Sequence, residues 1–171
     1  MFSTKLLTPS GPDGSHGTAS LFAAVSAVAE RSFFAVTEPC DDGRFKALAE
    51  AASGWLMASV QFEEGPVTGY VSCTLPDALA LALFDALTGR GPADPAPASY
   101  EIADLIGEFS NMVCGAWLSR VGSGEVLVLS RPIVGPATPP ARSDGRRLLM
   151  TVNDLPLAID HSLRWLPTTG V

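Results

Sequence analysis

Histidine and cysteine are scarce in this 171-residue sequence, which contains two histidines and three cysteines. His16 and His161 lie far apart, and Cys40, Cys73 and Cys114 form no Cys-x-x-Cys pair. Because metal centres need clusters of such ligands, the sequence predicts no metal site. An odd number of scattered cysteines is typical of reduced thiols in a cytosolic protein.

Basic residues and long apolar runs are also few. Eleven lysines and arginines stand against 18 acidic residues, which gives a formal net charge of -7. No basic cluster is present to neutralise the phosphates of a nucleic acid. The apolar stretches fall well short of the ~20 residues that a membrane span needs, and the N-terminus lacks the apolar segment of a signal peptide. We therefore expect a cytoplasmic protein that binds neither nucleic acid nor membranes.

The motifs of nucleophilic enzymes are missing as well. Ser15-His16 and Asp160-His161 place suitable residue types side by side, but the sequence has no Gly-x-Ser-x-Gly elbow and no Cys/His pair. Nucleophilic catalysis is therefore not expected.

The clearest pattern that is present predicts a long helix, with Ser99 as its expected N-cap. Apolar residues recur at helical spacing from Ile102 to Ala116, so one side of this helix is expected to lie in a core. Gly122 is expected to end it.

A second stripe runs along the same helix. Its members are two acids, an amide and a glycine, which fall within an arc of about 60°: Asp104, Glu108, Asn111 and Gly115. A glutamate can pair with a lysine of a partner, and an asparagine can hold a water molecule in one place. On spacing alone, an ordinary solvated helix face is the more common explanation of such a stripe.

The run Asp-x-x-x-Glu-x-x-Asn-x-x-x-Gly, together with Ile106-Gly107-Glu108 and Asn111-Met112, resembles the signature helix of the CheX/CheC/FliY family of chemotaxis phosphatases. The resemblance extends over residues 19–166 and is specific in this helix. Members of the family remove the phosphoryl group from the aspartyl phosphate of the response regulator CheY.

This resemblance implies a role for each residue of the stripe. Asn111 would position the attacking water, and Glu108 would dock to a lysine of the receiver domain. Asp104 and Gly115 would bind the partner. The partner, a phosphorylated CheY-like response regulator, would supply Mg²⁺, and the chain would need no cofactor of its own.

Relatives of the CheC type carry the Glu-x-x-Asn pair on two helices. In this sequence the first helix offers Glu30-Arg-Ser-Phe33, in which phenylalanine stands where asparagine would be needed. The second site is therefore absent, and the chain is most similar to a stand-alone CheX-like domain. The resemblance also implies a homodimer formed through sheet edges. The alternative is a non-catalytic module of the same fold that binds a receiver domain or associates with itself as a scaffold.

The rest of the chain predicts an α/β (α+β) fold of one domain. Residues 1–17 are expected to form a disordered arm, and residues 18–171 a single CheX-like domain with a linker-like connection at 89–98 and a mobile loop at 135–145. Helices are expected from Thr18 to about Phe34, near 45–52 and at 76–89, and strands at 55–62, 67–75, 125–134, 146–152 and 157–165. We predict a two-layer sandwich with a mainly antiparallel sheet of about five or six strands, two long helices on one face and pseudo-twofold halves.

Overall fold

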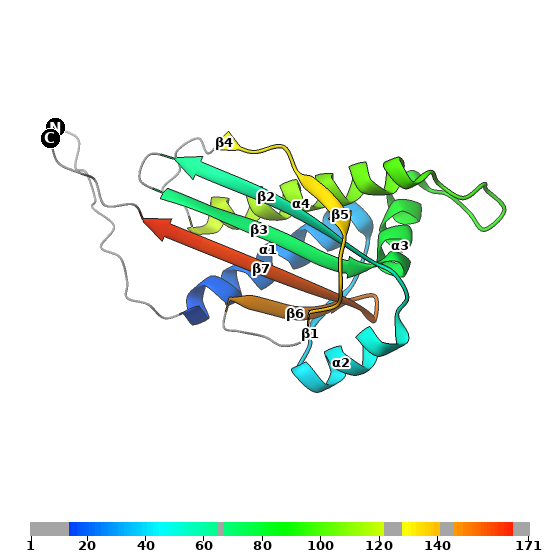
Figure 1. Cartoon of the computed structure of the whole chain (residues 1–171), viewed down its shortest axis with the longest axis horizontal. Coiled ribbons are helices and arrows are strands. Elements are labelled where there is room, and N and C mark those ends of the chain that lie inside the picture. Colours follow the sequence, from blue (N-terminus) through cyan, green and yellow to red (C-terminus); the bar gives the residue numbers. More distant parts are fainter. Residues whose placement is uncertain (1–13, 65–66, 122–127, 141–145, 166–171) are drawn as a thin grey trace, which may run out of the picture.

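The computed structural model describes residues 14–64, 67–121, 128–140 and 146–165 (Figure 1). Within these residues the chain forms four helices, α1 (Gly14–Phe33), α2 (Asp42–Ala51), α3 (Asp77–Thr88) and α4 (Ser99–Val121). It also forms seven strands, β1 (Thr37–Pro39), β2 (Trp55–Glu64), β3 (Val67–Pro76), β4 (Val128–Leu129), β5 (Ile133–Pro136), β6 (Arg147–Val152) and β7 (Leu155–Trp165). Most of the predicted N-terminal arm and residues 141–145 of the predicted loop lie outside the described residues.

The strands form one antiparallel sheet with the order β1-β6-β7-β3-β2-β4, and β5 also pairs with β2. The two long hairpins, β2 with β3 and β6 with β7, meet at the centre of the sheet through the pairing of β3 with β7. Short connections favour this antiparallel arrangement. The predicted fold class is confirmed.

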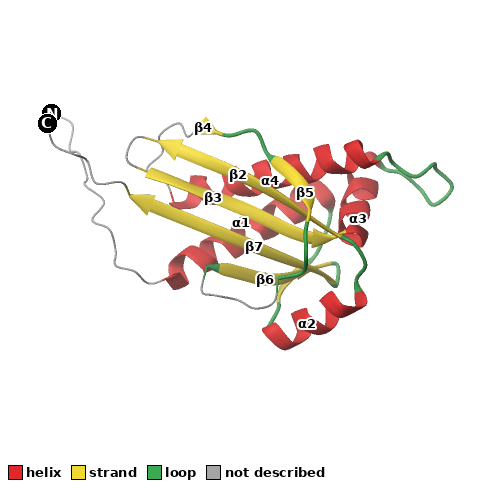
Figure 2. Ribbon diagram, viewed as in Figure 1, coloured by secondary structure: helices red, strands yellow, loops and turns green. Residues whose placement is uncertain are grey.

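Helices α1 and α4 lie across one face of the sheet (Figure 2). Their apolar sides share one large core with the facing side chains of the strands, and α3 contributes Leu79, Ala80 and Leu83 to it. The shorter α2 covers part of the opposite face, where Phe45 packs on Trp55 and Leu149. No helix in the described part of the chain has the length and apolarity that crossing a membrane would require.

The sheet order relates two halves of the chain. In the first half α1 is followed by the edge strand β1 and the β2–β3 hairpin, and in the second half α4 is followed by β4 and β5 and the β6–β7 hairpin. Each half lends its edge strand to the hairpin of the other, since β1 pairs with β6 and β5 pairs with β2. This exchange is the pseudo-twofold arrangement that the sequence predicted.

Several element ends follow from local chemistry. Asp41 caps α2, because its carboxylate accepts a hydrogen bond of 2.8 Å from the backbone N–H of Arg44. Gly89 ends α3 in the left-handed conformation, with φ of 69°. Asn153 and Asp154 also have positive φ, and they form the two-residue turn between β6 and β7.

The structure corrects the predicted elements at three points. Helix α1 begins at Gly14, so Thr18 lies inside the helix and is not its N-cap. The single strand predicted at 125–134 is divided in its described part into β4 and β5, because Pro132 lies between them and cannot donate a ladder hydrogen bond. Strand β1 was not predicted, since three residues that end in Pro39 give almost no periodic signal.

The three cysteines are free thiols in different surroundings. Cys73 on β3 and Cys114 on α4 are fully buried, and burial raises the pKa of each to about 12. Cys40 precedes α2 and is partly exposed.

We predict that at about pH 8 a thiol reagent modifies one cysteine, Cys40, in the folded protein and all three after denaturation, because only an accessible thiol can be deprotonated and attacked. Counting modified thiols by mass spectrometry in the two states checks this. Rapid labelling of Cys73 or Cys114 before unfolding would contradict the described core.

Candidate functional site

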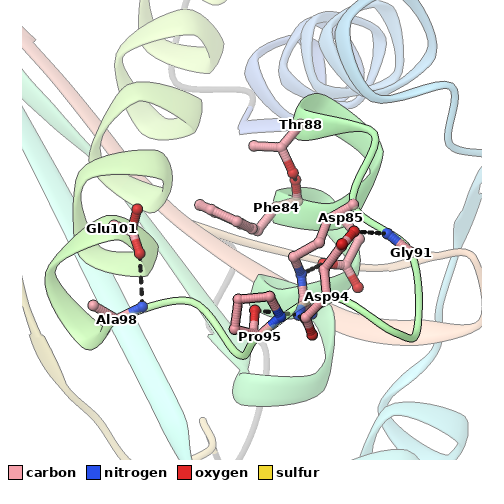
Figure 3. Close-up of polar contacts among 9 residues, drawn as sticks. Phe84, Asp85, Thr88, Gly91, Asp94, Pro95, Ala98 and Glu101 are labelled. Atoms are coloured by element: carbon pink, nitrogen blue, oxygen red, sulfur yellow. Dashed lines mark hydrogen bonds and ion pairs between the residues drawn. The ribbon is translucent and has the colours of Figure 1, made fainter.

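Helix α4 begins at a well-defined cap. The backbone N–H of Ala98 donates a hydrogen bond of 2.7 Å to Oε2 of Glu101, which is one half of a capping box (Figure 3). Ser99 is therefore the first helical residue and not the N-cap that the sequence predicted. The carboxylate of Glu101 also lies in the first turn, where the helix dipole favours negative charge.

The inner side of α4 fixes how the helix is rotated about its axis. The Phe109 ring meets the Phe33 ring of α1 edge to face, with centroids 5.6 Å apart. The Trp117 ring contacts both Phe62 of β2, at 6.1 Å, and His161 of β7, at 5.3 Å. Because these large rings are almost completely buried, rotating α4 would expose them to water.

In the orientation that these rings impose on α4, the predicted stripe faces outward. Asp104 and Glu108 are exposed, while Asn111 and Gly115 are partly exposed at the edge of the buried side. Within the described residues neither carboxylate forms an ion pair. The structure therefore presents the four predicted residues together on one open face of a helix.

Asn111 has an unsatisfied acceptor. Its Oδ1 is shielded from solvent, and no group among the described residues donates a hydrogen bond to it. Leaving a shielded acceptor without a donor costs about 1–3 kcal/mol. Because the atom is shielded, the Asn111 side chain must turn outward before Oδ1 can accept a hydrogen bond from a water or a partner, and it breaks no hydrogen bond among the described residues in doing so.

The two glycines of α4 have different surroundings. A Cβ atom added at Gly107 would lie 3.2 Å from Cβ of Pro132 and 3.5 Å from a methyl group of Val134, so Gly107 allows β5 to pack against the helix. A Cβ atom added at Gly115 would meet nothing within 4 Å. The sequence singled out Gly107 only as part of a motif, because its contact with β5 depends on tertiary packing.

These surroundings predict opposite responses to substitution. Gly115→Ala should raise the free energy of unfolding by up to about 1 kcal/mol, since alanine favours a helix and has room there. Gly107→Leu should lower it by about 1–3 kcal/mol, since the side chain would displace β5. Urea denaturation of both variants measures this, and equal changes of one sign would contradict the described packing.

A shallow groove of about 520 Å³ lies elsewhere, beside strands β2, β3 and β7. It is lined by Gln61, Phe62, Glu63, Thr68, Gly69, Tyr70, Val128, Ser130, Ser162 and Arg164. None of the four stripe residues contributes to it. The stripe itself runs along the outer side of a helix, a shape that suits contact with another macromolecule.

Comparison with solved structures shows the same fold in CheX proteins. CheX from Vibrio vulnificus is 18% identical, with a TM-score of 0.66 over 90% of this chain and 100% of that one. CheX from Desulfovibrio desulfuricans is 15% identical, with a TM-score of 0.64 over 87% and 99%. CheX from Borrelia burgdorferi, solved in a complex with CheY, BeF₃ and Mg²⁺, is 14% identical, with a TM-score of 0.57 over 85% and 96%.

Comparison at the level of sequence identifies the same family through one family model. No curated protein matches this chain significantly. The family model described as "Chemotaxis phosphatase CheX" matches residues 56–144, which is just over half of the chain and includes all four stripe residues. The chain therefore belongs to the CheX family of chemotaxis phosphatases.

Proposed function

We propose that this chain hydrolyses the aspartyl phosphate of a CheY-like receiver domain. Its family is described as a phosphatase, and the CheX of Borrelia burgdorferi was solved with CheY, BeF₃ and Mg²⁺. The observation that carries the proposal is that one helix face holds a partly exposed Asn111, whose Oδ1 has no donor among the described residues, and an exposed Glu108 that has no ion pair among them.

In the proposed reaction the catalytic residue of this chain is Asn111. Its Oδ1 accepts a hydrogen bond from a water molecule, which leaves a lone pair of the water oxygen directed at phosphorus. The new P–O bond forms as the bond between phosphorus and the receiver aspartate breaks, and the two protons of the water stay with the phosphoryl group, so that the products are dihydrogen phosphate and a free carboxylate. Phosphoryl transfer depends mainly on positioning and on charge neutralisation, so no nucleophile from this chain is required.

Glu108 has a docking role in this proposal. Its carboxylate pairs with a lysine of the receiver and thereby fixes how α4 lies over the phosphorylated aspartate. The receiver supplies Mg²⁺, which neutralises charge on the phosphoryl group. Asp104 contacts the partner before Glu108 along the helix, and Gly115 contacts it after Asn111. The open space at Gly115 lets the receiver surface approach the helix closely.

Asn111→Ala should lower kcat for phosphate release on the order of 10²-fold, because the water loses its fixed orientation. Affinity for the receiver charged with BeF₃ and Mg²⁺ should change little. Phosphate release and calorimetric binding measure the two quantities, with Gln61→Ala, an exposed amide in the groove, as the control. Equal turnover by wild type and Asn111→Ala would reject the catalytic role.

Glu108→Ala should instead weaken docking. We expect the KM for the phosphorylated receiver to rise about tenfold or more, because a lysine of the partner would lose its counter-charge. Glu63→Ala, which removes an exposed carboxylate in the groove, is the matched control. If wild type binds charged receivers but releases no phosphate from any of them, the non-catalytic scaffold becomes the better account.

We also propose that two copies associate through the sheet edge formed by β4 and β5. Val128 and Ile133 on this edge are 70% and 67% exposed, which is unusual for aliphatic side chains in strands. The opposite edge is charged, since Arg44 pairs with Glu38 at 3.1 Å and with Asp154 at 3.2 Å.

Ile133→Glu should therefore shift a dimer towards monomer, because each copy would bring a charge into the contact. Light scattering after size exclusion measures the mass, and Leu87→Glu, at an exposed position on α3, is the control. A monomeric wild type at high concentration would exclude this association.

A further inference from the structure

Tyr100 extends the stripe of α4 beyond the residues considered so far. It lies four residues before Asp104 and eight before Glu108, and at about 100° per residue it falls within an arc of about 80° that also contains Asn111 and Gly115. Its side chain is 68% exposed. An aromatic ring thus lies at the N-terminal end of the face that carries the two acids and the amide.

The backbone that holds Tyr100 is braced by the preceding loop. Arg90 donates from Nε to Oδ1 of Asp85 at 2.6 Å and from Nη1 to the carbonyl oxygens of Asp94 and Pro95, at 3.3 and 2.9 Å (Figure 3). The N–H of Gly91 donates to Oδ2 of Asp94 at 2.7 Å. The proline- and glycine-rich segment between α3 and α4 is therefore held against α3 by the largely buried guanidinium group of Arg90.

This bracing lowers the loss of conformational entropy when a partner binds to Tyr100. The ring is attached to the first turn of a capped helix and has only two side-chain torsions to fix. Tyrosine supplies a large contact area at a low cost in conformational entropy, which is why it is frequent among the dominant residues of interfaces.

The chemistry beside the ring selects a basic group. Asp104 is exposed one turn away, and no described residue forms an ion pair with it. A carboxylate one helical turn from an aromatic ring can give a cation a charge-assisted hydrogen bond while the ring gives it a cation–π contact. The net charge of -7 also favours a basic partner surface.

We propose that Tyr100 and Asp104 form a second contact with the receiver, in which they bind a lysine or arginine that lies outside its phosphorylation site. This inference rests on the proposed phosphatase function. With a rise of 1.5 Å per residue, Asp104 lies about 10 Å and Tyr100 about 17 Å along the helix from Asn111. The basic residue therefore lies roughly 10–17 Å from the phosphorylated aspartate, apart from the phosphorylation site, and the contact determines which receiver is dephosphorylated.

Steady-state phosphate release from the Mg²⁺-loaded, phosphorylated receiver tests the contact. Tyr100→Ala should raise KM about five- to tenfold and leave kcat unchanged, whereas Tyr100→Phe should retain most of the affinity because the ring remains. Asp104→Asn should raise KM at low salt but have less effect at high salt. Leu87→Ala, which removes a 54% exposed side chain on α3, is the matched control.

Alanine substitution of each receiver lysine and arginine at that distance then identifies the partner residue. One of them should remove the effect of Tyr100→Ala in a double-mutant cycle. A KM for Tyr100→Ala equal to that of wild type, or a loss confined to kcat, would overturn the inference and leave the phosphatase function intact. Failure of the wild-type chain to bind or dephosphorylate any receiver would reject both.

Discussion

The packing of α4 on α1 and the sheet is the constraint on which the rest of the structure depends. The rings of Phe109 and Trp117 are held between α1, β2 and β7, and together they allow only one rotation of the helix. That rotation sends Asp104 and Glu108 to solvent and leaves Asn111 at the boundary. The hydrophobic effect thus fixes the direction of polar groups that make no stabilising contact with the described part of the chain.

The same packing explains why a chain with two related halves presents one such face. The halves match in the order of their elements, but Phe33 of α1 is only 2% exposed and contacts Phe109. The position where the first helix would need an asparagine is therefore occupied by core. Glu30 is exposed on α1, but no asparagine follows it three residues later. The first half has kept its packing role and lacks the amide and acid pair.

Periodic segments bounded by glycine or proline were predictable from the sequence. The hairpin of β2 and β3, helix α3 with its cap at Gly89, and helix α4 all follow from residue spacing and turn chemistry. Short or interrupted elements were not predictable from the sequence. Strand β1 has three residues, β4 and β5 are divided around Pro132, and the placement of α2 on the opposite face depends on contacts of Phe45 with distant strands.

The candidate site, too, was predictable only where it depends on spacing within a single element. Helical spacing was sufficient to place Asp104, Glu108, Asn111 and Gly115 on one face, because that face is a property of a single helix. The shielding of the Asn111 Oδ1 was not predictable, nor was the bracing of the loop before Tyr100 by Arg90, because both depend on residues from other elements.

The most direct test of the central claim is a structure of this chain bound to a receiver domain that carries BeF₃ and Mg²⁺. We predict that α4 covers the phosphorylation site, with the Asn111 amide about 2.7–3.2 Å from a water in line with the bond from the aspartate to BeF₃. We also predict that Glu108 lies within hydrogen-bond distance of a receiver lysine. A complex in which the receiver contacts another face, and Asn111 remains remote from the aspartate, would contradict the central claim.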